Sequence, residues 1–125
     1  MKSYRDLDIY KDAYSLAVDI HDMSLTLPKF ELYEEGSQVR RCSKAICGAI
    51  VEGYGRRRYK AEFIRYLVMA HAECDETLLH LNILFDTKSL SDKAGYEKLK
   101  TSCEALGGRI NAFIQWVEKN WNAGG

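Results

Sequence analysis

The sequence is almost without helix breakers, since Pro28 is the one proline among 125 residues. Proline ends helices and fixes turns, so its scarcity excludes a disordered or linker-dominated chain and favours long, uninterrupted helices. Apolar residues make up 46% of the sequence, which is enough to fill one buried core. We therefore expect residues 1–125 to form a single all-α domain.

Long apolar runs and a charge of one sign are also missing. No stretch approaches the roughly 18 consecutive apolar residues that span a membrane, and residues 1–12 lack the apolar core of a signal peptide. We expect a cytoplasmic protein with no membrane partner. The 18 basic and 18 acidic side chains cancel, so any contact with nucleic acid must come from basic residues that cluster locally.

The patterns that mark metal and catalytic sites are missing as well. No cysteine belongs to a C-x-x-C pair, which favours free thiols in a reducing compartment for all four: Cys42, Cys47, Cys74 and Cys103. A di-iron bundle needs Glu-x-x-His pairs on two helices, and the sequence has none. The best remaining set places His71, Cys74 and Asp75 on one helix, with no evident ligand on another. We therefore expect no cofactor, no metal and no catalytic residue, and hence a protein that is not an enzyme.

Apolar residues recur at three- and four-residue spacing in four segments, the pattern of amphipathic helices. The expected helices cover residues 7–27, 38–53, 60–85 and 92–117. Short connections make successive helices antiparallel neighbours, so the sequence predicts an antiparallel up-down-up-down four-helix bundle. Pro28 is expected to end the first helix, because the residue before a proline is pushed out of helical geometry.

The first expected helix is apolar on nearly two faces. One stripe consists of Ile9, Ala13, Leu16, Ile20 and Leu27. A second stripe consists of Leu7, Tyr10, Tyr14, Ala17, His21 and Leu25. One stripe suffices for packing inside a bundle. The second therefore indicates another burial surface, such as a neighbouring subunit.

The stretch QVRRCSKAICGAIVEGYGRRR, residues 38–58, combines a core helix with a basic turn. Gly53 and Gly55 flank Tyr54, and we expect them to break the helix by adopting positive φ. The turn is not a phosphate-binding loop, because no strand precedes it and no lysine–serine or lysine–threonine pair follows it. The candidate nucleic-acid-binding residues are Arg40, Arg41, Lys44, Arg56, Arg57, Arg58 and Lys60. The alternative is a solvated turn whose arginines pair with carboxylates, as Arg56 would with Glu52.

These residues resemble a known family, the small bacterial four-helix bundle proteins encoded within intervening sequences of 23S ribosomal RNA genes. The resemblance covers nearly the whole chain and is densest in QVRR at residues 38–41 and IVEGYGR at residues 50–56. The chain departs from the family at residues 45–53, where it has AICGAIVEG in place of the frequent SIPxNIAEG. The bundle is also similar to the accessory variability determinant protein of diversity-generating retroelements.

The resemblance implies a homo-oligomer, with a pentameric ring as the form suggested by the retroelement relative. It also implies binding to RNA, DNA or a reverse transcriptase through a basic surface. Our first hypothesis is a non-enzymatic oligomeric bundle that binds nucleic acid, or an enzyme acting on it, through the seven basic residues. The alternative hypothesis is a protein-interaction or structural scaffold with no nucleic-acid role.

Overall fold

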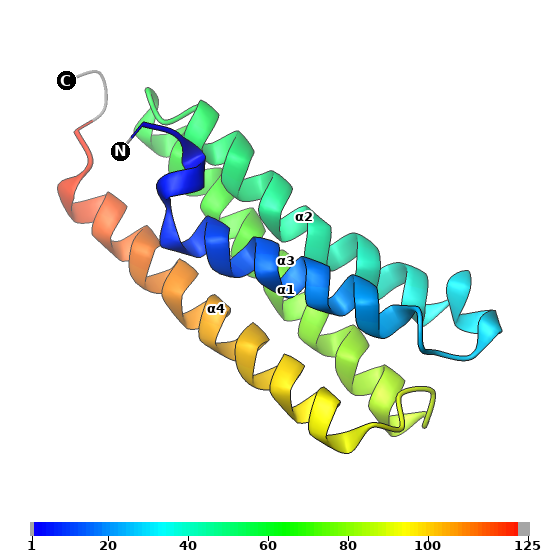
Figure 1. Ribbon diagram of the computed structural model, residues 1–125. Coiled ribbons are helices and arrows are strands. Elements are labelled where there is room, and N and C mark those ends of the chain that lie inside the picture. The colour runs from blue at the N-terminus through cyan, green and yellow to red at the C-terminus, as the bar shows by residue number, and fades with distance from the viewer. Residues whose placement is uncertain (1, 123–125) are drawn as a thin grey trace.

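The computed structural model describes residues 2–122 and consists of four long helices (Figure 1). They are α1 (Asp8–Ser24), α2 (Glu35–Gly55), α3 (Lys60–Asp86) and α4 (Lys93–Asn120), with short 3-10 turns η1 (Tyr4–Asp6) and η2 (Lys29–Leu32). Residues 2–122 contain no β-strand. The all-α fold expected from the sequence is confirmed. No helix in this range is long and apolar enough to cross a membrane.

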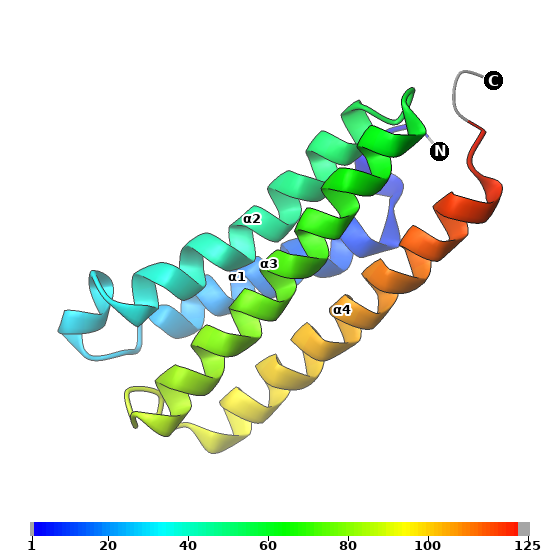
Figure 2. The same cartoon turned by 180° about the vertical axis from the view of Figure 1, so that it is seen from behind.

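Successive helices run in opposite directions along the bundle (Figures 1 and 2). α2 packs against α1 and α3, and α4 packs against α3 and α1, which closes the bundle. Consequently η1, the α2–α3 turn and the last turn of α4 lie at the same end. The other end carries η2 and the α3–α4 loop. Short connections between amphipathic helices produce this arrangement.

The core is formed where the four apolar stripes meet. Its fully buried side chains include Ile20, Val39, Ile46, Ile50, Phe63, Leu67, Leu81, Leu84, Leu106, Ile110 and Val117. Their three- and four-residue spacing is what places them on one face of each helix. On α1, the stripe containing Ile9 and Leu16 is buried in this core, whereas Tyr14 on the other stripe is exposed.

The end of α1 differs from the expectation. The helix stops at Ser24, so Pro28 does not end it directly. The Ser24 hydroxyl donates to the His21 carbonyl oxygen at 2.7 Å, and the Thr26 hydroxyl donates to that of Met23 at 2.7 Å. These side chains satisfy carbonyl groups that have no partner within the helix. Pro28 instead precedes η2 as its first flanking residue.

α2 ends at Gly55, within the predicted break at residues 53–55, but the predicted cause, positive φ at the glycines, is wrong. The helix continues through Gly53 to Gly55, and neither glycine has positive φ. A Cβ atom at Gly53 would lie 3.0 Å from the Tyr66 Cβ and 3.3 Å from the Phe63 carbonyl oxygen of α3. The absent side chain of Gly53 therefore allows α2 and α3 to approach closely. Chain reversal takes place in the basic residues that follow.

Candidate functional site

The seven candidate basic residues lie in two groups at different places on the bundle. Arg40, Arg41 and Lys44 are in the first half of α2, whereas the group from Arg56 to Lys60 forms the α2–α3 turn. The 16 positions from Arg40 to Arg56 correspond to about 24 Å of helix at roughly 1.5 Å per residue. The two groups therefore cannot form one compact patch within a single copy of the chain.

Arg56 is held by carboxylates at the start of the turn. Its Nε lies 3.2 Å from Glu52 Oε2, and its Nη1 lies 3.4 Å from Glu62 Oε1. Glu62 also accepts from Arg65 Nε at 2.8 Å, and this hydrogen bond lowers the pKa of the Glu62 carboxyl. The hydrogen bond to Glu52 raises the pKa of Arg56. The expected pairing of Glu52 with Arg56 is confirmed.

The next three cations of the turn have no such partners. Within residues 2–122, none of Arg57, Arg58 and Lys60 has a nitrogen within 4.0 Å of a carboxylate oxygen. Arg57 donates to the Tyr54 carbonyl oxygen at 2.9 Å, and Lys60 Nζ donates to the Glu118 carbonyl oxygen at 2.6 Å. Carbonyl groups leave the positive charge of a side chain uncompensated. These three residues therefore create a local positive potential on a protein whose total charge is zero.

Aromatic rings alternate with these cations. The Arg57 guanidinium carbon lies 3.9 Å from the centre of the Tyr54 ring, and that of Arg58 lies 5.9 Å from the centre of the Tyr59 ring. We call this surface the arginine–tyrosine corner, consisting of Tyr54, Arg56, Arg57, Arg58, Tyr59, Lys60, Arg65 and Tyr66. The sequence analysis missed the tyrosines, although YGRRRY shows them on both sides of the three arginines.

The end of α4 fixes the position of the corner. The Trp121 indole Nε1 donates to the Arg57 carbonyl oxygen at 2.9 Å. The Trp121 ring packs edge-on against Phe63, with the ring centres 5.1 Å apart. The Lys60 contact with Glu118 joins the same two elements. Contacts from the end of α4 thus hold the α2–α3 turn in place. A turn that served only to expose solvated arginines would not need such contacts.

The first group of candidate cations forms contacts near the other end of the bundle. Arg40 donates to the Leu32 carbonyl oxygen at 2.7 Å and to the Ser24 hydroxyl at 3.2 Å. Arg41 donates to Gln38 Oε1 at 3.3 Å. Arg40 thus ties α2 to the segment between α1 and α2, which is a structural role.

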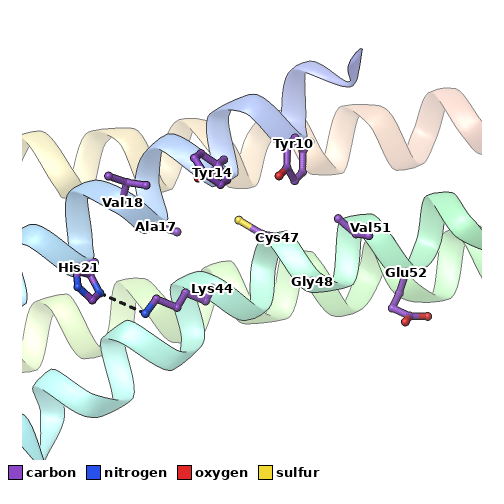
Figure 3. A pocket seen from close by; sticks show the side chains of 10 residues that line it. All are labelled: Tyr10, Tyr14, Ala17, Val18, His21, Lys44, Cys47, Gly48, Val51 and Glu52. Atoms are coloured by element: carbon purple, nitrogen blue, oxygen red, sulfur yellow. Dashed lines mark hydrogen bonds between the residues drawn. The ribbon is translucent and has the colours of Figure 1, made fainter. Parts of the chain in front are cut away.

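An apolar groove of about 790 Å³ lies between α1 and α2 (Figure 3). Its lining consists of Tyr10, Tyr14, Ala17, Val18, His21, Lys44, Cys47, Gly48, Val51 and Glu52. Lys44 Nζ and His21 Nδ1, 3.2 Å apart, mark one end, and Glu52 marks the other (Figure 3). On its rim, Tyr14 is 56% exposed and Val18 44% exposed. Of the second stripe of α1, Tyr14 is thus left exposed, whereas Ala17 is buried and Tyr10 packs against Tyr4.

The thiols are free, and three of the four are buried. Cys74 and Cys103 face each other between α3 and α4 with their sulfur atoms 3.7 Å apart. Cys74 therefore does not combine with His71 and Asp75, whose side-chain atoms Nδ1 and Oδ2 lie 3.8 Å apart. The metal set considered from the sequence is not assembled.

A different set of possible metal ligands joins α2 and α3. Donor atoms of Cys42, Glu73 and Glu76 lie within 4.8 Å of one another. Burial and the Glu76 carboxylate raise the pKa of the Cys42 thiol to about 12, so the thiol is protonated at neutral pH and donates to Glu76 at 3.5 Å. This hydrogen bond accounts for the arrangement without an ion.

Comparison with known proteins identifies relatives of the sequence and of the fold. A family model described as 23S rRNA-intervening sequence protein matches residues 5–112. No curated protein matches the sequence significantly. The crystal structure of a protein of unknown function from the S23 ribosomal protein family of Bacteroides thetaiotaomicron superposes with a TM-score of 0.77. At 20% identity it covers 86% of this chain and 95% of its own, which shows that the two share a fold.

Proposed function

The chain belongs to the family of 23S rRNA-intervening sequence proteins, and from this premise we propose that it is a non-enzymatic helical scaffold that binds nucleic acid. The arginine–tyrosine corner is the proposed contact surface. The observation that carries the proposal is the position of Arg57, Arg58 and Lys60 beside exposed aromatic surface and away from carboxylates. Cations in such a position are available to phosphate groups.

The distribution of charge supports this corner over the first half of α2. The net charge of the whole chain is zero, so long-range attraction to a polyanion is absent and only a local excess of cations can bind phosphates. The corner has such an excess. Arg40 ties α2 to Leu32 and Ser24 through two hydrogen bonds and lies about 24 Å along the helix from Arg56. It is therefore not part of the corner, and we assign it no role there.

A comparison of two double variants tests the proposal. R57Q/R58Q removes two charges from the corner, and R41Q/K44Q removes two charges from the first half of α2. Binding of a fluorescently labelled mixed-sequence RNA is followed by anisotropy at several salt concentrations. Each lost phosphate contact should reduce the slope of log K against log salt by about 0.7 for single strands. R57Q/R58Q should therefore reduce the slope by about 1.4, with little change for R41Q/K44Q.

Two outcomes would contradict the proposal. One is the absence of binding to RNA and DNA at low salt. The other is an equal loss of affinity in the two double variants, because that would mean general charge and not the corner determines binding. Far-UV circular dichroism of both variants controls for unfolding.

The groove between α1 and α2 supports a second candidate function, self-association. Exposed Tyr14 and Val18 beside a hollow at Gly48 form an apolar surface of the kind that a partner covers. A second copy of this chain is the proposed occupant, because Lys44 and Glu52 give the groove ends of opposite charge and the same surface presents both. Two copies joined groove to groove in this way close as a two-fold dimer. The pentamer implied by the family resemblance requires instead that the groove contact a different surface of the next copy.

Multi-angle light scattering of V18E and V68E tests self-association. Val18 lies on the rim of the groove, whereas Val68 on α3 is 51% exposed and does not line it, which makes V68E the matched control. The unmodified chain should be an oligomer, V18E should shift to monomer, and V68E should not. A chain that stays monomeric at high concentration, or equal dissociation by V68E, would contradict this proposal.

A further inference from the structure

One ring of the arginine–tyrosine corner differs from the other two. Tyr54 is buried under the Arg57 guanidinium. The guanidinium carbons of Arg56 and Arg65 lie 5.1 Å and 4.7 Å from the centre of the Tyr66 ring. Tyr59 is 63% exposed. Its nearest cation, Arg58, lies 5.9 Å from the ring centre. Tyr59 therefore presents a large apolar ring surface to solvent in the middle of the basic turn.

The backbone around Tyr59 is well fixed. Its N–H donates to the Arg56 carbonyl oxygen at 2.9 Å, and its carbonyl oxygen accepts from the Phe63 N–H at 3.0 Å as α3 begins. The residues on either side of it are the cations Arg58 and Lys60. Because the Arg57 carbonyl is bonded to Trp121 and Lys60 to Glu118, the turn is pinned to α4. A ligand that stacks on Tyr59 would therefore lose little binding free energy in ordering this segment.

An exposed aromatic ring between cations matches the chemistry of an unpaired nucleotide. Each unpaired nucleobase has a free π-face for the ring, and the adjoining phosphates suit the cations. Bases in a duplex are stacked on both faces, and the major groove of an RNA helix is too deep and narrow for side chains to read. A duplex could use the cations of the corner but not the Tyr59 ring.

We infer that the corner is specific for single-stranded over duplex nucleic acid, with Tyr59 as the platform on which one unpaired base stacks and Arg58 and Lys60 as contacts to the flanking phosphates. This inference rests on the proposed nucleic-acid-binding function. It adds the form of the ligand and the residue that selects it.

The test compares a labelled oligouridylate with an RNA duplex of the same length by fluorescence anisotropy. Y59A removes the ring, Y59F keeps it, and Y33A removes a ring that is 84% exposed at the opposite end of the bundle. Y59A should weaken oligouridylate binding by about five- to 150-fold. It should leave duplex binding and the salt slope unchanged, because no phosphate contact is lost. Y59F and Y33A should bind as the unmodified chain does.

The outcomes separate the inference from the proposal on which it rests. Failure to bind either RNA would overturn the proposed function and the inference with it. Binding of both RNAs with no effect of Y59A would overturn the inference alone. Equal weakening of single-strand and duplex binding by Y59A, or the same loss in Y33A, would also overturn it, since a stacking platform does not act on paired bases.

Discussion

Replacing Gly53 by alanine perturbs the closest approach of α2 to α3, the contact that sets the geometry of the arginine–tyrosine corner. The added methyl group would lie 3.0 Å from the Tyr66 Cβ and 3.3 Å from the Phe63 carbonyl oxygen. Neither atom is the end of a flexible side chain, so the helices themselves must move apart. Overpacking of this kind costs about 1–3 kcal/mol.

Gly48 supplies the matched control in the same helix. A Cβ atom there would meet nothing within 4 Å, so G48A should stabilise the protein by about 0.5–1 kcal/mol through helix propensity alone. The same gain offsets part of the cost of G53A, leaving it neutral to about 2.5 kcal/mol less stable. Since propensity cancels between the variants, their difference of about 1–3 kcal/mol measures the steric contact.

Urea denaturation followed by far-UV circular dichroism measures both free energies of unfolding. The expected order of stability is G48A, then the unmodified chain, then G53A. If G53A were as stable as G48A, the close helix contact at Gly53 would be refuted, and with it our explanation of this glycine.

Three further substitutions test other details of the structure. Burial and then Glu76 raise the pKa of Glu73 above its usual 4.5. Ionisation of this carboxyl is therefore penalised in the folded state, and stability falls as pH rises from 4.5 through the raised pKa. E73Q should raise Tm at pH 7 and show no gain below pH 4.5. Lys88 has φ of 68°, so K88G should stabilise by about 0.5–1 kcal/mol in urea melts. The Asp92 carboxylate caps α4 by accepting from the Gly95 N–H at 3.0 Å, so D92A should lose about 1 kcal/mol. A change of the opposite sign in any variant would contradict the corresponding contact.

The four helices were predictable because their apolar spacing repeats over many turns. The ends of the helices were not, because they depend on side-chain contacts. α1 ends at Ser24, before Pro28, where the Ser24 and Thr26 hydroxyls donate to backbone carbonyls of the last turn. Gly53 looked like a turn residue, but its role depends on Phe63 and Tyr66 of another helix, and a single sequence does not distinguish a glycine for turning from a glycine for packing.

The candidate site was predicted only in part. The separation of Arg40 from Arg56 follows from helix rise alone, so the division into two groups was open to sequence reasoning. The surroundings of these cations were not, because the Leu32 and Glu118 carbonyls reach Arg40 and Lys60 from other segments. Whether a cation is neutralised depends on nearby carboxylates, such as Glu62 of α3 beside Arg56. A single sequence does not place these groups, so the sequence analysis treated all seven residues alike.

The most direct test of the nucleic-acid interface is an amide chemical-shift titration of the isotope-labelled protein with an oligouridylate at low salt. The largest changes should fall on residues 54–66 and on the Trp121 indole N–H, which is bonded to the Arg57 carbonyl. The amides of Arg40, Arg41 and Lys44 should change little. No changes, or changes centred on the first half of α2 or on the groove between α1 and α2, would contradict the assignment of the arginine–tyrosine corner as the binding surface.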